Sequence, residues 1–186
     1  MAENTNQTTK VVTGKVRASY VHIFQPQSID GNDPKYSMSI IIPKSDKKTL
    51  NAIKKAIEAA KVAGTAKFGG KIPANLKTPL RDGDIDREDD PAYADAYFIN
   101  CTSKTKPGVV DQQRNEITDS SDIYSGCYVR VSLNFYAYNT NGNKGIAAGL
   151  NNVQKWADGE YLGGRSRAED DFDDLDDDFG DDDFLD

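Results

Sequence analysis

The sequence predicts a mainly β fold: a small, closed or partly closed antiparallel barrel of five strands, with one helix, an elaborated loop and a disordered acidic tail. Runs rich in β-branched and aromatic residues are separated by turn residues, which is typical of strands. A single segment has apolar residues at helical spacing. The final 18 residues contain twelve acidic side chains and no basic one.

The charge of the chain divides between a body and a tail. The 186 residues include 23 Lys and Arg and 30 Asp and Glu, for a net charge of −7. Residues 169–186 hold twelve of the acids, so residues 1–168 keep 18 acids against 23 bases and a net charge of +5. A block of like charges this dense repels itself, so we expect the tail to be disordered.

The tail also carries apolar residues spaced among its acids, which is the composition of a short interaction tail. The residues expected to bind a partner are Phe172, Phe179, Phe184 and Leu185. A solubilising tail without a partner is the alternative, although solubility alone does not call for phenylalanines.

The first elements are expected in this order. Residues 1–9 form a flexible N-terminal arm. The β-branched run 11–24 predicts a long strand, in which Gly14 allows a bend or a bulge. Residues 36–42 alternate in polarity and predict a second strand that ends at Pro43.

One helix and a long loop follow. Ser45 or Asp46 can cap a helix that continues to about Ala63, because apolar residues recur there at helical spacing. Residues 64–94 are rich in Gly, Pro and Asp without a clear period, so an elaborated loop is expected. The remaining strands are expected at residues 97–102, 107–111, 126–139 and 146–153, with a hairpin turn at Asn141-Gly142 between the last two.

This pattern predicts one folded domain. It spans residues 10–160, and residues 161–168 form a linker to the tail at 169–186. No apolar run approaches the ~20 residues of a membrane span, so no membrane contact is expected. The first ten residues are polar, so no secretion signal is expected.

The predicted strand 126–139 has two distinct faces. Six apolar residues of period two, from Cys127 to Ala137, define a core face. The opposite face carries Tyr128, Arg130, Ser132, Asn134, Tyr136 and Tyr138. Exposed aromatics at this spacing offer stacking platforms for unpaired bases, and arginine adds phosphate or cation–π contacts.

A nucleic-acid surface is therefore expected on this face, joined by cations of the first strand and of the hairpin turn. The residues expected to bind single-stranded DNA (ssDNA) are Lys15, Arg17, Tyr128, Arg130, Tyr136, Tyr138 and Lys144. The alternative is that the tyrosines pack under the loop 64–94 or against a partner subunit.

The sequence gives little support for catalysis or metal binding. The single histidine, His22, excludes most His-based triads and metal sites, and Cys101 and Cys127 are expected to be reduced core residues. The run from Asp82 to Asp86 opens like a calcium loop, but Arg87 stands where glycine is needed. We expect no catalytic residue, metal or cofactor.

Several segments carry a resemblance to a known family. The stretches PKYSMSIIIPKSD, YSGCYVRVSLNFYAYNTNGNKGIAAGLNNVQ and EDDFDDLDDDF resemble those of bacteriophage ssDNA-binding proteins, formerly a domain of unknown function. The resemblance implies an oligonucleotide/oligosaccharide-binding (OB) fold. It implies a non-enzymatic protein that coats ssDNA during phage replication, recombination and repair, in the cytoplasm of the infected bacterial host. It also implies a tail that engages DNA polymerase or other replication proteins.

The expected function is thus ssDNA binding without sequence specificity, with a tail that competes with DNA for the basic body. Two other classes stay open: a DNA-mimicking inhibitor, and a metal-dependent nuclease that uses Asp82, Asp84 and Asp86. A homo-oligomer and a strand-annealing activity also stay open.

Overall fold

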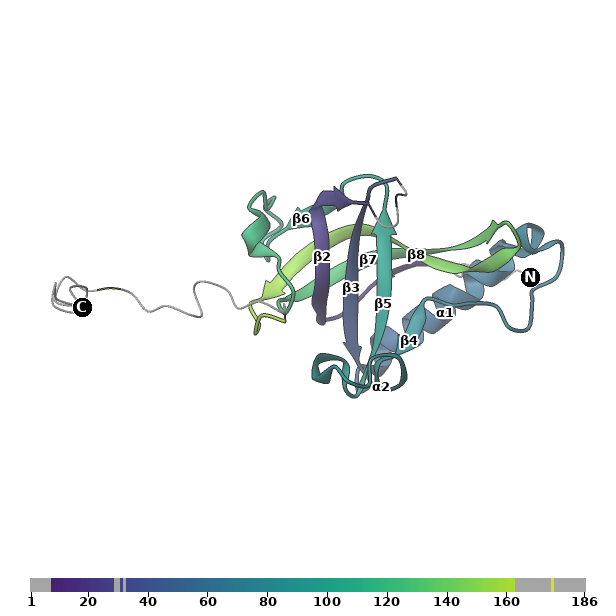
Figure 1. Ribbon diagram of the computed structural model, residues 1–186, viewed down its shortest axis with the longest axis horizontal. Helices are drawn as coiled ribbons and strands as arrows, with labels where there is room; N and C mark the ends of the chain where they lie inside the picture. Colours follow the sequence, from purple (N-terminus) through teal and green to yellow (C-terminus); the bar gives the residue numbers. More distant parts are fainter. Residues whose placement is uncertain (1–7, 29–30, 32, 163–174, 176–186) are drawn as a thin grey trace.

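A closed ring of five strands forms the centre of the computed structural model, which describes residues 8–28, 31, 33–162 and 175. The ring strands are β2 (Val16–Gln27), β3 (Lys35–Pro43), β5 (Ala96–Ser103), β8 (Asn143–Ala157) and β7 (Tyr128–Thr140). Four neighbouring pairs are antiparallel, and a parallel pairing of β5 with β8, at Cys101 and Ala148, completes the ring. Figure 1 shows β2, β3 and β5 crossing β7 and β8. The predicted fold, a mainly β, OB-like ring with one main helix, is confirmed.

Three short strands extend this ring. β1 (Lys10–Val12) pairs with β7, β4 (Leu80–Asp82) pairs with β5, and β6 (Gly108–Val110) runs parallel to β8. The single strand expected at 11–24 is therefore two strands. The chain turns between them because Thr13 donates its N–H to the carbonyl of Val131, while Gly14 donates to the hydroxyl of Thr49.

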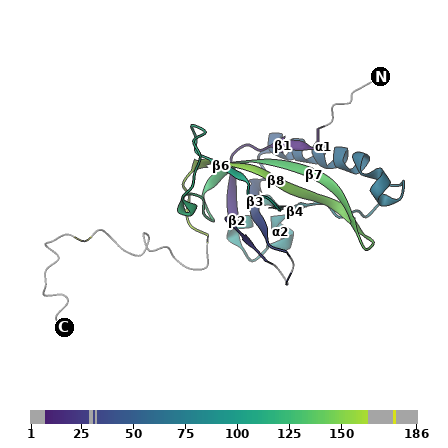
Figure 2. The same ribbon diagram turned by 90° about the horizontal axis from the view of Figure 1, so that it is seen from above.

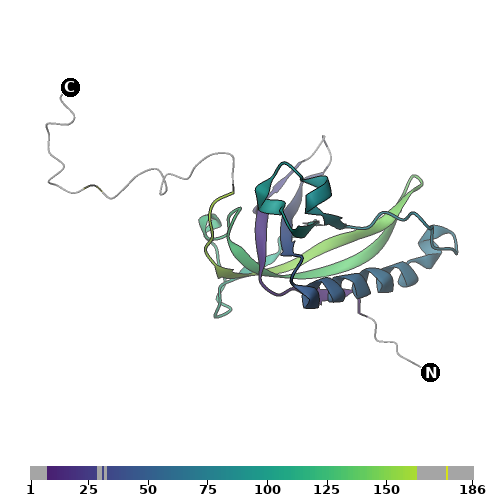
Figure 3. The same cartoon turned by 90° about the horizontal axis from the view of Figure 1, so that it is seen from below.

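The β7–β8 hairpin extends beyond the ring, and α1 (Lys47–Ala63) runs along it, as Figures 2 and 3 show. Asp46 caps α1 by accepting the N–H of Thr49 at 3.2 Å. The apolar face of α1 joins the core face of β7 in one buried cluster. The turn at Asn141-Gly142 has φ values of 54° and 88°, so the predicted hairpin is confirmed.

The loop 64–94 contains more regular structure than the sequence indicates. It includes η1 (Thr65–Phe68), β4, α2 (Gly83–Asp86) and η2 (Pro91–Tyr93). Its last part packs on the outer face of β3 and β5, where a second small core forms from Ile41, Tyr93, Ala96 and Phe98. β3 is consequently buried on both faces over much of its length.

The connection between β6 and β7 holds one short turn of helix, η3 (Ser120–Asp122). In the part of the chain that the structure describes, every helix is too short or too polar to cross a membrane. The expected N-terminal arm lies largely outside the described residues, as do the linker and the acidic tail apart from 161–162 and Leu175.

Candidate functional site

The two faces of β7 differ as the period of two predicts. The six core-face residues, from Cys127 to Ala137, are at most 5% exposed. All six side chains of the opposite face, which we call the outer face of β7, are partly or fully exposed. Tyr136 is the most open of its tyrosines, at 43% exposed. The outer face therefore presents aromatic rings and a guanidinium to solvent.

One group of the expected DNA-binding residues gathers where β2 meets β7. The Nζ of Lys15 lies 4.7 Å from the ring centroid of Tyr128, and the Cζ of Arg17 lies 5.6 Å from it. Arg17 and Tyr128 are direct partners in the β2–β7 pairing. Two cations thus lie against one ring, which is a favourable cation–π arrangement.

Arg17 also holds the end of the folded body. Its Nε donates to the carbonyl of Gly126 at 3.1 Å, and its Nη2 donates to the carbonyl of Glu160 at 2.8 Å. We call residues 158–162 the strap. The strap is held further by the N–H of Leu162, which donates to the carbonyl of Ser125. A guanidinium has five N–H donors, so Arg17 can hold the strap and still donate to an anion.

A second group lies toward the hairpin turn. The ring of Tyr138 lies beside Gly145, where a Cβ atom would come within 2.5 Å of the tyrosine Oη. Gly149 makes similar room for the ring of Tyr136, 3.5 Å from the position of a Cβ. Lys144 donates to the carbonyl of Phe68 at 3.3 Å, which ties the hairpin to the loop after α1. Glycines on β8 therefore let two tyrosine rings lie across the hairpin.

Arg130 stands between the two groups. Its Nε donates to the carbonyl of Thr13 at 3.0 Å. It lines a hollow of about 230 Å³ together with Arg114 from the loop after β6 and Gln154 from β8. The seven expected residues are thus not one cluster. Tyr128 and Tyr136 are eight residues apart on one strand, a separation of about 27 Å at strand rise.

Sequence reasoning missed several exposed residues near these groups. Arg114 is brought to Arg130 by a loop, so no local pattern marks it. Trp156 is 45% exposed. The period of two that buries Ile146 and Leu150 would have placed it in the core, but a bulge in β8 after Leu150 reverses the phase. Tyr20 is 59% exposed at a φ of 48°, where the register of β2 against β3 shifts.

A further open groove lies along β2. It has a volume of about 480 Å³ and is lined by His22, Phe24, Lys106 and residues of the η3 loop. The Nζ of Lys106 lies 5.9 Å from the ring centroid of Phe24. This groove is a second place where an aromatic ring and a cation meet at the surface.

Three of the six acids of the loop 64–94 form ion pairs. Lys44 contacts Asp82 at 3.0 Å and Asp84 at 2.8 Å, and Arg81 contacts Asp86 at 3.0 Å. The hydrogen bond from Lys44, followed by that from the backbone of Asp95, lowers the pKa of Asp84. Among the described residues, no three His, Cys, Asp or Glu side chains are grouped to hold a metal ion.

The remaining expectations concern cysteines and the tail. Cys101 and Cys127 are both buried as free thiols, and burial raises the pKa of Cys101 to about 12. The tail residues expected to bind a partner lie outside the described residues: Phe172, Phe179, Phe184 and Leu185.

The ring of five strands with an aromatic and cationic outer face defines an OB-type barrel. Residues 9–185 match the family of the ssDNA-binding protein of Enterobacter phage Enc34. The chain belongs to this family.

Three similar proteins illustrate the relationship. Protein p50 of Acyrthosiphon pisum secondary endosymbiont phage 1 is 33% identical over 178 residues, which is 89% of this chain and 94% of that protein. The structure of the Enc34 protein in complex with ssDNA is 28% identical, with a TM-score of 0.75 over 87% of this chain and 97% of that one. The ssDNA-binding protein gp2.5 of bacteriophage T7 has a TM-score of 0.60 at 18% identity, over 87% of this chain and 91% of that one, and so shares the fold.

Proposed function

We propose that the protein binds ssDNA with little sequence preference along the outer face of β7. Bases stack on Tyr128, Tyr136 and Tyr138, while the neighbouring cations contact phosphates. The observation that carries this proposal is the set of partly or fully exposed aromatic and cationic side chains along the outer face of β7 in an OB-type barrel. The Enc34 relative, whose structure contains ssDNA, supports the same ligand class.

The chemistry of this face explains why binding would be insensitive to sequence. Every base has a flat π-face, so stacking on tyrosine is worth about 1–3 kcal/mol per base whatever the base. Phosphate contacts by Lys15, Arg17, Arg130 and Lys144 add affinity that falls with salt. Four such contacts would give a slope of about −3 in a plot of log affinity against log salt concentration.

Fluorescence-anisotropy titration of an oligo-dT tests the proposal. Tyr136→Ala and Arg130→Ala should each weaken binding by about tenfold, in line with the loss of one stacking or charged contact. Lys35→Ala, an exposed lysine at the start of β3, is the control and should bind as the wild type does. Wild-type affinity in both test variants, with a loss in Tyr20→Ala instead, would place the DNA against β2.

The biological role that we propose is the coating of ssDNA during phage replication, recombination and repair, in the cytoplasm of the bacterial host, without catalysis. A nuclease is less well supported, because Lys44 and Arg81 engage the three carboxylates that it would use. A DNA mimic is less well supported because it spreads acids over a folded face, whereas this chain concentrates them at its end. Incubation of labelled ssDNA with the protein and Mg²⁺ or Mn²⁺ should leave the DNA uncut.

We propose that the tail competes with ssDNA and, when displaced, recruits a replication protein such as a DNA polymerase. Twelve carboxylates tethered to a basic body are present at high effective concentration. Truncation after Arg167 should therefore tighten ssDNA binding, and more so at low salt than at high salt. Equal or weaker binding by the truncated chain would exclude competition and leave recruitment as the tail's role.

A further inference from the structure

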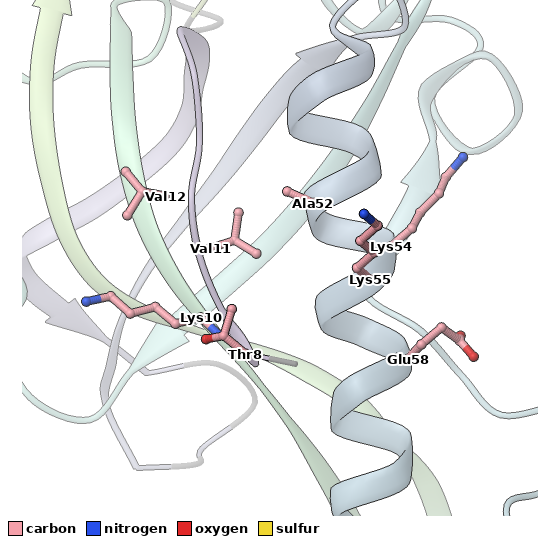
Figure 4. Close-up of a pocket in the computed structure, with 8 residues that line it drawn as sticks. All are labelled: Thr8, Lys10, Val11, Val12, Ala52, Lys54, Lys55 and Glu58. Atoms are coloured by element: carbon pink, nitrogen blue, oxygen red, sulfur yellow. The ribbon is translucent and has the colours of Figure 1, made fainter. Parts of the chain in front are cut away.

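The hollow of about 230 Å³ beside Arg130 crosses the wall that β1, β7, β8 and β6 form. Val12 from β1 and Val110 from β6 give it apolar sides. Figure 4 shows that Val12 points away from α1, in agreement with its pairing with Ser132 of the outer face. Sites for drug-sized ligands usually measure about 300–1,000 Å³, so this hollow fits a smaller group, such as one base.

The hollow lies between two of the outer-face tyrosines. Arg130 follows Tyr128 by two residues on β7, and Ser132 comes next before Tyr136 on the same face. Tyr128 and Tyr136 are about 27 Å apart at strand rise. An extended strand of DNA that contacts both rings would therefore pass over the hollow.

Two arginines at the hollow are available to an anion. The Nε of Arg130 donates to the carbonyl of Thr13 at 3.0 Å, which leaves its Nη groups for a ligand. Within the described part of the chain, neither Arg130 nor Arg114 forms an ion pair with a carboxylate. A guanidinium binds a phosphate through two parallel N–H donors, so either arginine can hold one.

The loop that carries Arg114 is held in one shape. The carboxylate of Asp111 accepts the backbone N–H groups of Gln113 and Asn115, both at 2.9 Å. Gln154 donates to the carbonyl of Asp111 at 3.2 Å and so fixes the loop to β8. Arg114 has a φ of 69°, in the left-handed region that residues other than glycine rarely adopt. Its surroundings therefore impose this conformation, as is common at ligand-binding sites.

Side-chain amides complete the rim of the hollow. The Oδ1 of Asn152 accepts the N–H of Gly108 at 3.2 Å, which leaves the Nδ2 of Asn152 as a donor. Gln154 donates to the loop through its Nε2, which leaves its Oε1 as an acceptor. The edges of bases present both donors and acceptors. The rim can therefore bond a base as well as a phosphate.

We propose that the hollow holds one nucleotide of bound ssDNA, with the base against Val12 and Val110 and the phosphate beside Arg114 and Arg130. This inference rests on the proposed function and adds to it a contact from a loop outside β7. The position of the hollow between two outer-face tyrosines favours DNA over a protein ligand.

Oligo-dT titration of Arg114→Asn tests the contact, because asparagine tolerates the left-handed region. Affinity should fall about tenfold, as expected for the loss of a charged hydrogen bond. The slope of log affinity against log salt concentration should become less steep by about 0.7, the value for one phosphate of a single strand. The control is Gln113→Ala in the same loop, which keeps the backbone bond to Asp111 and should bind as the wild type does.

Asp111→Ala separates the position of Arg114 from the charge of the loop. It removes the acceptor that holds the loop, and it also removes one negative charge. Charge alone predicts tighter binding of DNA, whereas a displaced Arg114 predicts weaker binding. Weaker binding is expected, and tighter binding would overturn the assignment of Arg114 as a positioned contact.

Photo-crosslinking locates the DNA. The photoreactive residue p-benzoylphenylalanine replaces either Val12, which is 52% exposed, or Ala52, an exposed residue of α1 on the opposite side of β1 (Figure 4). Oligo-dT should crosslink to the first variant and not to the second, and the yield at position 12 should fall when Arg114→Asn is added. Equal yields from the two positions, or crosslinks from position 12 to another protein chain instead of DNA, would overturn the proposal.

The proposed function is read separately, from the wild type and Tyr136→Ala. Failure of the wild type to bind oligo-dT would refute the proposed function itself. Binding that Tyr136→Ala weakens but Arg114→Asn leaves unchanged would overturn only the contact at the hollow.

Discussion

Arg17 donates from its Nη2 to the carbonyl oxygen of Glu160 at 2.8 Å, although 143 positions separate the two residues in the chain. The same guanidinium lies 5.6 Å from the ring centroid of Tyr128. Arg17 therefore contacts both Tyr128, on the outer face of β7, and the strap that precedes the acidic tail. A phosphate that binds Arg17 would therefore alter the contacts of this side chain with Tyr128 and with the strap.

Replacing Arg17 should loosen the strap. In Arg17→Met the carbonyls of Gly126 and Glu160 lose a charged donor, and such hydrogen bonds typically contribute about 1.5–3 kcal/mol. Hydrogen exchange at the amide of Leu162, which donates to Ser125, should become about tenfold faster or more. Arg81→Met is the control, because that arginine pairs with Asp86 and lies away from the strap. Unchanged exchange in Arg17→Met would show that the strap is held by its other contacts.

A methyl group at Gly145 should destabilise the hairpin. Its Cβ would lie 2.5 Å from the Oη of Tyr138 and 2.9 Å from the carbonyl oxygen of Lys77, so the strand or the ring must move. Overpacking of this kind costs about 1–3 kcal/mol. Thermal unfolding of Gly145→Ala should show a Tm that is lower by several degrees.

The matched control for this substitution is Gly142→Asn in the same hairpin. Gly142 has a φ of 88° with open space around it, and asparagine tolerates the left-handed region. Its Tm should stay close to that of the wild type. Equal Tm values for Gly145→Ala and the wild type would mean that the ring of Tyr138 moves aside at no cost.

The alternation of β7 could be predicted because one of its faces is buried from Val129 to Ala137. The alternation of polarity did not predict that both faces of β3 are buried. Ile41 and its β5 neighbour Phe98 are covered by Tyr93, which comes from a loop that has no period of its own. That covering is a long-range contact, which local patterns do not encode. The sequence therefore predicts the ring and the helix but not the second core.

The candidate site, like the fold, was predicted only in part. The period of two located the outer-face tyrosines, whereas Arg114 comes to Arg130 through a loop. The phase of β2 beyond Ser19 could not be predicted, because the register against β3 shifts before His22. The expected DNA-binding residues form two groups because β7 is a long strand, and its length was predicted from the sequence.

The two cysteines should resist thiol reagents in the folded protein. Both are fully buried, and burial raises the pKa of Cys101 to about 12, so its reactive thiolate is rare at pH 8. Ellman's reagent should find two thiols in denaturant and almost none in the native protein. Lys104→Cys, at an exposed position, should add one fast-reacting thiol. Rapid native labelling of the wild type would indicate that the core opens readily.

The ion pairs of Lys44 should stabilise the fold at neutral pH and fail in acid. The pKa of Asp84 is lowered in the folded state, so its contribution is complete above the unfolded value of about 3.9 and is lost as pH falls through the folded value. The pKa of Lys44 is raised, so its contribution is complete below its unfolded value of about 10.4 and is lost only as pH rises through the folded value. Asp84→Asn should thus have a lower Tm than the wild type at pH 7, and the difference should shrink as the pH is lowered below about 3.9. Asp89→Asn, which replaces an exposed acid of the same loop, should match the wild type over the same pH range. A Tm difference for Asp84→Asn that persists in acid would assign its effect to the lost hydrogen-bond geometry rather than to charge.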